Sequence, residues 1–296
     1  MLSLLRFALV ILAASLAAPA LAADQDWQKV GQALGKEGTA QPGGVYRVAL
    51  PRSDLKVMLD GVALKPGFAL GGWVAFEPMG KQAMVMGDLV LTQDEVNPVM
   101  RKFEEQGIEI TAVHNHLLRA EPMTLYMHIV GHGDPVTLAS ALHAGLSLSK
   151  TPLGQPSAQQ PAAAPSDLDT AAIDQAMGRK GKDNGGIYQF SIPRAQETKD
   201  EGMAVPEPMG SAIGINFQPT GGGKAAITGD FVLTASEVNP VIKALAAGGI
   251  EITALHSHML DEQPRLFFMH FWANDDAQKL AKGLRAALDK IAIKQS

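Results

Sequence analysis

The chain has 296 residues, of which 46% are hydrophobic and 19% charged, with 30 Gly, 18 Pro and no Cys. At roughly 150 residues per domain, this length predicts two domains, each large enough to bury its own core. The composition excludes a collagen-like, disulfide-stapled or wholly disordered protein, and without Cys there can be no thiol nucleophile, Cys-ligated zinc or iron–sulfur cluster. A formal net charge of -5 argues against a nucleic-acid partner, which would need a basic face.

Residues 1–23 have the pattern of a secretory signal peptide. Arg6 gives a positive start, an apolar core follows, and Ala20-Leu21-Ala22 forms an A-x-A cleavage site. The alternative is a membrane anchor, but the apolar run after Arg6 meets Pro19 before it reaches the roughly 20 residues that a spanning helix needs. We therefore expect cleavage near Ala22 and a mature protein, without a transmembrane segment, that is periplasmic or secreted.

An internal duplication organises the rest of the chain. Residues 87–134 align with residues 229–276 at a constant offset of 142, and 23 of the 48 positions are identical. The match extends upstream, where Gly43-Gly44-Val45-Tyr46 aligns with Gly185-Gly186-Ile187-Tyr188. A segment rich in Pro, Ala and Gln separates the copies and is typical of an extended linker. The resulting division is a signal peptide (1–23), repeat 1 (24–149), a linker (150–166) and repeat 2 (167–296).

The expected elements have the same order in both copies. Each copy opens with a helix, over 27–34 in repeat 1 and 168–177 in repeat 2. In repeat 1, extended apolar runs then predict strands over 45–50, 73–76 and 83–91. A helix ends at Gly107, after starting either from the capping box Thr92-x-x-Glu95 or from Asn97-Pro98. Two strands (109–118 and 123–131) and a helix (136–148) close the repeat.

This order predicts an α+β fold built from two tandem homologous repeats. Each repeat would be a mostly antiparallel sheet with helices packed on it. The two repeats could pack as a pseudo-dimer that buries the sheet edges. The copies differ in one stretch: residues 53–64 alternate like an extra hairpin, whereas the corresponding part of repeat 2 is polar and interrupted. That difference predicts a structural element present in repeat 1 only.

Histidines are concentrated in the predicted C-terminal hairpins of both copies. Because side chains alternate along a strand, two histidines separated by one residue share a face. A turn at 120–122 would place His114 opposite His128 on that face, so that three imidazoles converge in each copy. The six candidate metal ligands are His114, His116, His128, His256, His258 and His270.

The same pattern also fits a structural network, since paired histidines on a strand can hydrogen-bond to neighbouring groups inside a core. If the histidines do bind a metal, zinc is the default, and nickel, iron or copper would also suit imidazole ligands. Asp88 and Asp230, each within an apolar strand, are candidates for a general base, a further ligand or a hydrogen-bonded bulge. His132, which repeat 2 replaces with Asn274, is a second candidate catalytic residue on the histidine face.

Three segments of repeat 1 closely resemble the LppY/LpqO family of exported bacterial proteins: GGVYRVALPRSDLKVMLDGV, VAFEPMGKQAMVMGDLVLTQDEVNPVM and IEITAVHNHLLRAEPMTLYMHIVGHGDP. INFQPTGGGKAAITGDFVLTASEVNPVI and LFFMHFWANDD resemble the second repeat of that family. The resemblance implies an exported protein with a duplicated domain and no assigned activity. Members are often lipoproteins, but a chain without Cys would be free of such an anchor.

Three functions remain open at this point. The first is an exported protein that binds a metal ion or small ligand through its histidine hairpins. The second is a metal-dependent hydrolase or lyase, in which three His ligands activate a water molecule. The third is a structural or interaction module of the cell envelope, with the histidines serving its core.

Overall fold

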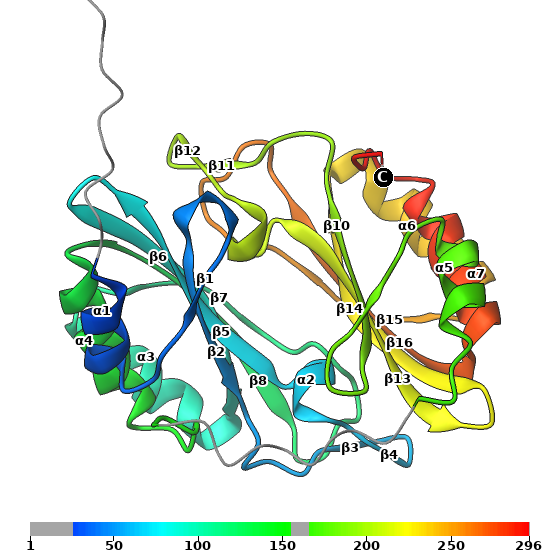
Figure 1. Ribbon diagram of the computed structural model, residues 1–296, viewed down its shortest axis with the longest axis horizontal. Helices are drawn as coiled ribbons and strands as arrows, with labels where there is room; N and C mark the ends of the chain where they lie inside the picture. The colour runs from blue at the N-terminus through cyan, green and yellow to red at the C-terminus, as the bar shows by residue number, and fades with distance from the viewer. Residues whose placement is uncertain (1–25, 155–165, 296) are drawn as a thin grey trace, which may run out of the picture.

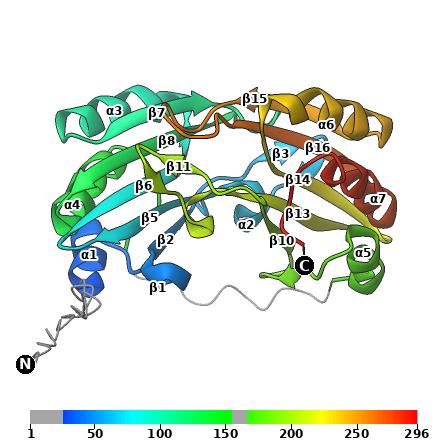
Figure 2. The same cartoon turned by 90° about the horizontal axis from the view of Figure 1, so that it is seen from above.

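The computed structural model describes residues 26–154 and 166–295. The predicted signal peptide and most of the predicted linker lie outside these residues. The described chain forms two six-stranded antiparallel sheets whose outer faces carry helices, in four layers: helix, sheet, sheet, helix (Figures 1 and 2). The predicted α+β fold with two tandem repeats is confirmed. No helix among the described residues is long and apolar enough to cross a membrane.

Repeat 1 forms a sheet with the order β1-β2-β5-β6-β8-β7. Its strands are β1 (Thr39–Ala40), β2 (Tyr46–Pro51), β5 (Gly71–Met79), β6 (Gln82–Thr92), β7 (Glu109–His114) and β8 (Thr124–Gly133). Its outer helices are α1 (Trp27–Leu34), α3 (Gln93–Glu105) and α4 (Pro135–Leu146). An excursion between β2 and β5 holds the hairpin β3 (Met58–Leu59) and β4 (Val62–Ala63), followed by the short helix α2 (Pro66–Ala69).

Repeat 2 forms the equivalent sheet, with the order β9-β10-β13-β14-β16-β15. Its strands are β9 (Lys182–Asp183), β10 (Tyr188–Pro193), β13 (Ala212–Gly221), β14 (Lys224–Leu233), β15 (Glu251–His256) and β16 (Phe267–Asp276). Its outer helices are α5 (Thr170–Met177), α6 (Ala235–Ala247) and α7 (Ala277–Leu288). Its excursion holds the hairpin β11 (Lys199–Asp200) and β12 (Met203–Ala204) and a 3-10 turn, η2 (Glu207–Met209).

The two faces of each sheet have different roles. On the outer face of repeat 1, Phe76 and Leu89 are buried against Phe103 of α3 and Leu142 of α4 in one apolar cluster. Each such side chain contributes about 1.5–3 kcal/mol through removal from water. The inner faces of the two sheets turn towards each other (Figure 2). They carry the polar residues that line the site. The helices therefore stabilise each sheet from outside and leave the inner face free for function.

A capping box sets the start of α3. The Thr92 side chain accepts from the Glu95 backbone, while the Glu95 side chain accepts from the Thr92 backbone, and α6 repeats this arrangement. Thr92, rather than Asn97, is thus the N-cap, and Asn97-Pro98 lies within the helix. The fully buried Arg52 donates to Glu95 at 2.7 Å, which joins the start of α3 to the end of β2.

Each excursion reaches across to the sheet of the other repeat. The excursion of repeat 1 contacts β13 of repeat 2: its Ala63 carbonyl accepts from the Gln218 amide, and its Phe68 carbonyl accepts from the Asn216 amide. From repeat 2, η2 packs on Trp73, and Arg47 donates to the Pro208 carbonyl. The prediction of a hairpin unique to repeat 1 is wrong, because both copies form a two-stranded hairpin at this position. The polar sequence of repeat 2 concealed it.

Candidate functional site

The six predicted histidines lie together at the interface of the two repeats. Their rings stack in three pairs, each combining one histidine from each repeat. The ring centroids are 3.4 Å apart for His114–His256, 3.6 Å for His116–His270 and 3.6 Å for His128–His258. Since positions 142 apart are equivalent, His114–His256 lies at the centre and the other two pairs are related by pseudo-two-fold symmetry. The two predicted triads thus merge into one cluster.

The ends of the histidine strands differ from the sequence-based prediction. Strand β7 stops at His114, so His116 lies in the following loop, although its ring remains 5.1 Å from that of His114. His114 is paired with Tyr126 and Ala112 with His128, so the register is two residues away from the predicted one. A two-residue difference keeps each side chain on the same face, which is why the histidines still converge.

A bulge in each histidine strand fixes the loop of the other repeat. The register shifts between Ile110 and Ala112, and again at the equivalent point of β15. The bulged residue is Thr111 in one copy and Thr253 in the other. The Thr111 hydroxyl donates to the His258 carbonyl at 2.6 Å, and the Thr253 hydroxyl donates to the His116 carbonyl at 2.5 Å. Each repeat therefore positions a ligand loop of its partner repeat.

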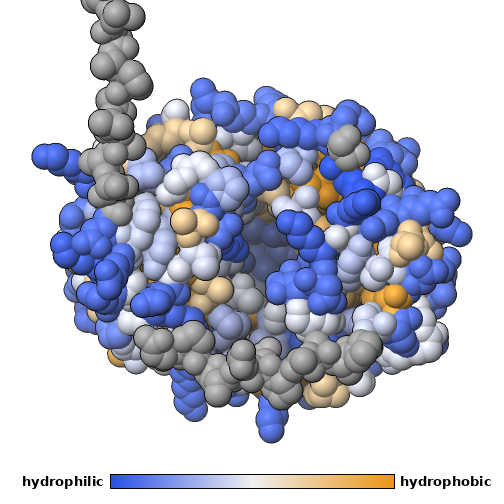
Figure 3. All heavy atoms as spheres, viewed as in Figure 1, coloured by the Kyte–Doolittle hydropathy of each residue, from blue (hydrophilic) through white to orange (hydrophobic). Residues whose placement is uncertain are grey.

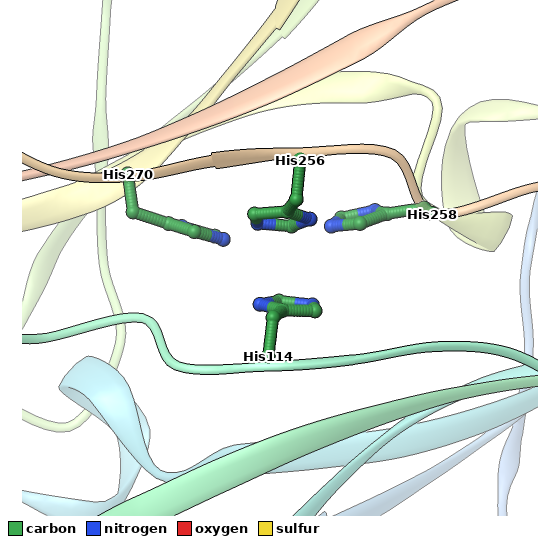
Figure 4. A group of neighbouring side chains, drawn as sticks. All are labelled: His114, His256, His258 and His270. Carbon is green, nitrogen blue, oxygen red and sulfur yellow. The ribbon is translucent and has the colours of Figure 1, made fainter.

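The imidazole nitrogens of the cluster converge on common points. Candidate ligand atoms of His114, His116 and His128 all lie within 4.8 Å of one another. The same holds for a second group, which again includes His114, together with the three histidines of repeat 2 (Figure 4). In Figure 4, His258 and His270 point towards His256 from opposite sides. Four imidazole nitrogens within this distance of one another match the ligand number of a tetrahedral site.

Hydrogen bonds fix the tautomers of three rings. The Nδ1 atoms of His114, His256 and His270 lie 3.1, 3.3 and 2.9 Å from the carbonyl oxygens of Asn115, Ser257 and Gly229. A carbonyl can only accept, so Nδ1 carries the proton and Nε2 keeps its lone pair. The Nε2 atoms of all six histidines are buried and have no hydrogen-bond partner among the described residues. The cluster therefore presents buried, unpaired lone pairs.

Burial keeps these rings neutral. Desolvation lowers the pKa of His114 to about 4 and that of His256 to about 3. Desolvation, followed by repulsion between the neighbouring imidazoles, holds the pKa values of His116, His128 and His258 well below the ordinary 6.5. The rings are therefore neutral at neutral pH, which is the form that binds a metal. In His114, His256 and His270 the remaining proton is on Nδ1, so their Nε2 atoms are free.

Two aspartates flank the cluster. Asp88 is paired across the strands with His128, and Asp230 with His270. Asp88 Oδ1 lies 3.8 Å from His128 Nε2, and Asp230 Oδ1 lies 3.4 Å from His270 Nδ1. Burial raises the pKa of Asp88 to about 7, against the attraction of Arg47. Burial and the proximity of Asp88 raise the pKa of Asp230 well above its ordinary value. Either carboxyl could exchange a proton near the cluster.

A cavity of about 870 Å³ gives access to the site between the two sheets. It is visible as the hollow at the centre of Figure 3. Four of the clustered histidines (His116, His128, His258 and His270) and both aspartates line it. Its size lies within the range of sites for small organic ligands, which is roughly 300–1,000 Å³. The cluster is thus open to a small ligand from one side.

Among the residues predicted from sequence, the six histidines and Asp88 come together, whereas His132 does not. His132 is exposed and pairs with Met84 on β6. It lies beyond His128 on β8, near the end of that strand. Sequence reasoning missed Arg47 and Trp73, which line the cavity and stack on each other at 4.1 Å. A comparison of the aligned copies could have found Arg47, because repeat 2 has Gln189 there.

Comparisons with known proteins agree with the duplication. Residues 28–148 and residues 171–290 each match the family described as Domain of Unknown Function (DUF1259). No curated protein matches the chain.

Two solved structures are distantly similar. One is a trimeric bacterial microcompartment shell protein, PduB, with 12% identity and a TM-score of 0.21 over 86% of this chain and 90% of that one. The other is the ethanolamine utilization protein EutL from Leptotrichia buccalis, with 8% identity and a TM-score of 0.19 over 72% of this chain and 82% of that one.

Proposed function

The chain belongs to the family described as Domain of Unknown Function (DUF1259), and we propose that its function is to bind a divalent transition metal between its two repeats. One observation carries the proposal: six imidazole Nε2 atoms are buried together without hydrogen-bond partners among the described residues. A buried unpaired nitrogen costs about 1–3 kcal/mol, and here that cost recurs six times within one cluster. A bound cation would supply the missing partner for several of these lone pairs at once.

The ligand chemistry favours an ion of the zinc, nickel, copper or iron class. Imidazole suits all of these ions, and zinc is the default because it accepts four nitrogen ligands without a preferred d-electron geometry. The carbonyl bonds to Nδ1 of His114, His256 and His270 are the supports that metal-ligating histidines commonly have. The residues that would hold the ion are His114, His116, His128, His256, His258 and His270.

Metal analysis tests the proposal directly. Untagged protein is treated with a chelator, dialysed against zinc, nickel or copper, freed of excess ion and analysed by mass spectrometry. We expect at least one ion per chain, and His258→Ala should lower this content, whereas His143→Ala should not. His143 lies on α4 and donates from Nδ1 to the Leu34 carbonyl, away from the cluster. Less than a tenth of an equivalent of every metal in the wild-type protein would refute the proposal.

A second candidate function is metal-dependent hydrolysis. The cavity favours it, because a purely structural metal site is closed, whereas a catalytic site keeps an accessible position. Bound zinc would lower the pKa of a water molecule to about 7, and Asp88 or Asp230 would accept its proton. Hydrolysis of p-nitrophenyl acetate should then require metal and fall in Asp88→Asn. Turnover that is equal with and without metal would exclude this function.

We further propose that the protein is exported and belongs to the LppY/LpqO type. The motifs of both repeats and the leader-like residues 1–23 support this proposal. Expression of the full chain, followed by cell fractionation and N-terminal sequencing, should give a product that begins just after Ala22 outside the cytoplasm. A cytoplasmic product that retains Arg6 would contradict it.

A further inference from the structure

Arg47 is a half-buried cation on the wall of the cavity, and it forms no ion pair with any described residue. Two buried arginines that follow the ends of β2 and β10 do form ion pairs: Arg52 pairs with Glu95 at 2.7 Å and Arg194 with Glu237 at 2.8 Å. Arg47 instead donates to the Pro208 carbonyl and stacks on Trp73. Charges withdrawn from water are usually paired, because desolvation costs several kcal/mol. Asp88 of the same cavity attracts Arg47 but forms no ion pair with it, so the guanidinium remains suited to an anion from solution.

The fold itself does not require this cation. The equivalent position in repeat 2 is Gln189, which also lines the cavity. Its amide donates to Asn216 at 2.9 Å and accepts from Asn184 at 2.8 Å, so a neutral side chain satisfies the same strand position. The charge of Arg47 is thus specific to one repeat, although the histidine cluster below it uses both.

A second difference between the repeats opens space opposite Arg47. Trp73 pairs with Asp88 across the strands of repeat 1, and Gly214 pairs with Asp230 at the equivalent position of repeat 2. A Cβ atom placed on Gly214 would meet no atom within 4 Å, so the cavity is open there. Trp73 instead fills its side of the cavity and holds the guanidinium at 4.1 Å from its ring. The wall around Arg47 is therefore cationic and filled by Trp73, whereas the wall beside Gly214 is vacant and carries the amides of Gln189 and Asn216. The exposed Lys182 also lines the cavity on the repeat 2 side.

We propose that the cavity binds one small organic anion per chain, with its carboxylate or phosphate group on Arg47 and its organic part in the space beside Gly214. Both groups present the paired oxygens that a guanidinium fork binds. The asymmetry of the walls sets a single orientation, although the cavity base is pseudo-symmetric. This site goes beyond the proposed metal centre and does not require the ion.

Calorimetric titration with succinate and with glycerol 3-phosphate tests the site and distinguishes the two anion types. At least one of the two should bind saturably with one molecule per chain, and the neutral counterparts succinamide and glycerol should not. Arg47→Gln, which installs the residue of repeat 2, should weaken binding about tenfold or more, because a charge-assisted hydrogen bond is lost. Arg101→Gln is the matched control, since it removes the same charge from an exposed position on α3.

Gly214→Leu gives an independent readout that leaves Arg47 intact. Filling the vacant wall should weaken whichever organic anion binds to the wild-type protein, and thermal unfolding checks that the variant is folded. Repeating the titrations on chelator-treated and zinc-treated protein separates the two proposals: failure of metal binding alone leaves the dependence on Arg47 unchanged. Absence of binding of both anions, or equal binding by Arg47→Gln and the wild type, would overturn the anion site.

Discussion

Replacement of His128 by Leu should stabilise the metal-free protein. His128 is 5% exposed, its Nε2 has no hydrogen-bond partner among the described residues, and its nearer ring contact is the 3.6 Å stack on His258, with His114 at 5.0 Å. Removing a buried unpaired nitrogen should gain about 1–3 kcal/mol, while the lost stack costs about 0.5–1.5 kcal/mol. Leu has nearly the volume of His, so no large cavity forms. The expected net effect is a stabilisation of about 1 kcal/mol.

Urea unfolding of chelator-treated protein measures this change in stability. Thermal unfolding with and without added zinc measures how much the metal stabilises each protein. The variant should have a Tm about 2–4 °C above that of the wild type without metal. Zinc at 100 times its Kd should stabilise the wild-type protein by about 2.7 kcal/mol and the variant by much less. His143→Leu is the control: it removes the bond from Nδ1 to the Leu34 carbonyl, so it should destabilise the protein and preserve the zinc effect.

The same experiment separates a binding site from a structural network. If the histidines stabilise the core, His128→Leu should lower the free energy of unfolding of the metal-free protein, as any disrupted network would. A destabilisation of about 1 kcal/mol or more, with an unchanged response to zinc, would therefore refute the reasoning from unpaired nitrogens.

Three further predictions concern stability. Arg52→Leu should lower the free energy of unfolding in urea by about 3–5 kcal/mol, because it leaves the buried Glu95 without its ion-pair partner. Arg101→Leu should change that free energy by less than about 0.5 kcal/mol. Equal effects of the two substitutions would contradict this role of the ion pair. Gly145→Ala should lower the free energy of unfolding by about 1–3 kcal/mol, since the new Cβ would lie 2.2 Å from the Phe103 ring. Gly67→Ala is the control, because its Cβ would meet no atom within 4 Å. If Gly145→Ala leaves the stability unchanged, α4 can shift to make room. Burial lowers the pKa values of six histidines, which bind protons on unfolding, and raises those of Asp88 and Asp230, which release them. The metal-free protein should therefore lose stability as the pH falls through the ordinary histidine pKa of 6.5, because six groups take up protons on unfolding and only two release them. Stability that does not fall with pH in this range would show that the rings are not held neutral.

Repetition made much of the fold predictable from sequence. The two copies share turn and capping residues at equal spacing, so the helix boundaries predicted at Thr92 and Gly107 are supported by the same residue types in repeat 2. Alternation failed for the hairpin of repeat 2, because its two strands are short, the first of them is polar, and the hairpin is held by backbone hydrogen bonds between Lys199 and Gln263. Local patterns do not record contacts of this kind.

The histidines of the site were predictable, but their arrangement was not. Period-two spacing placed the six side chains on the inner faces, and a register error of two residues left that conclusion intact. The stacking of His116 on His270 depends on how the repeats pack, which no spacing within one repeat contains. Arg47 was missed because a single charged residue in an alternating strand is ordinarily a solvent-facing one.

Both repeats contribute to the histidine cluster at the base of the cavity, whereas the walls differ, with Arg47 in repeat 1 and Gly214 in repeat 2. This difference indicates how the duplication serves the site. Because each of the three close histidine pairs joins the two repeats, one repeat alone holds only half of each such pair. The hydroxyls of Thr111 and Thr253 also position the other repeat's loop. Loss of a histidine in either copy would therefore weaken the whole cluster, so both copies must keep their hairpins. The walls carry no such mutual dependence, and Arg47 could arise opposite a vacant Gly214 without disturbing the base. Two independent, symmetric sites would each need their own copy of the wall residues that contact a ligand. One shared site needs these residues only once.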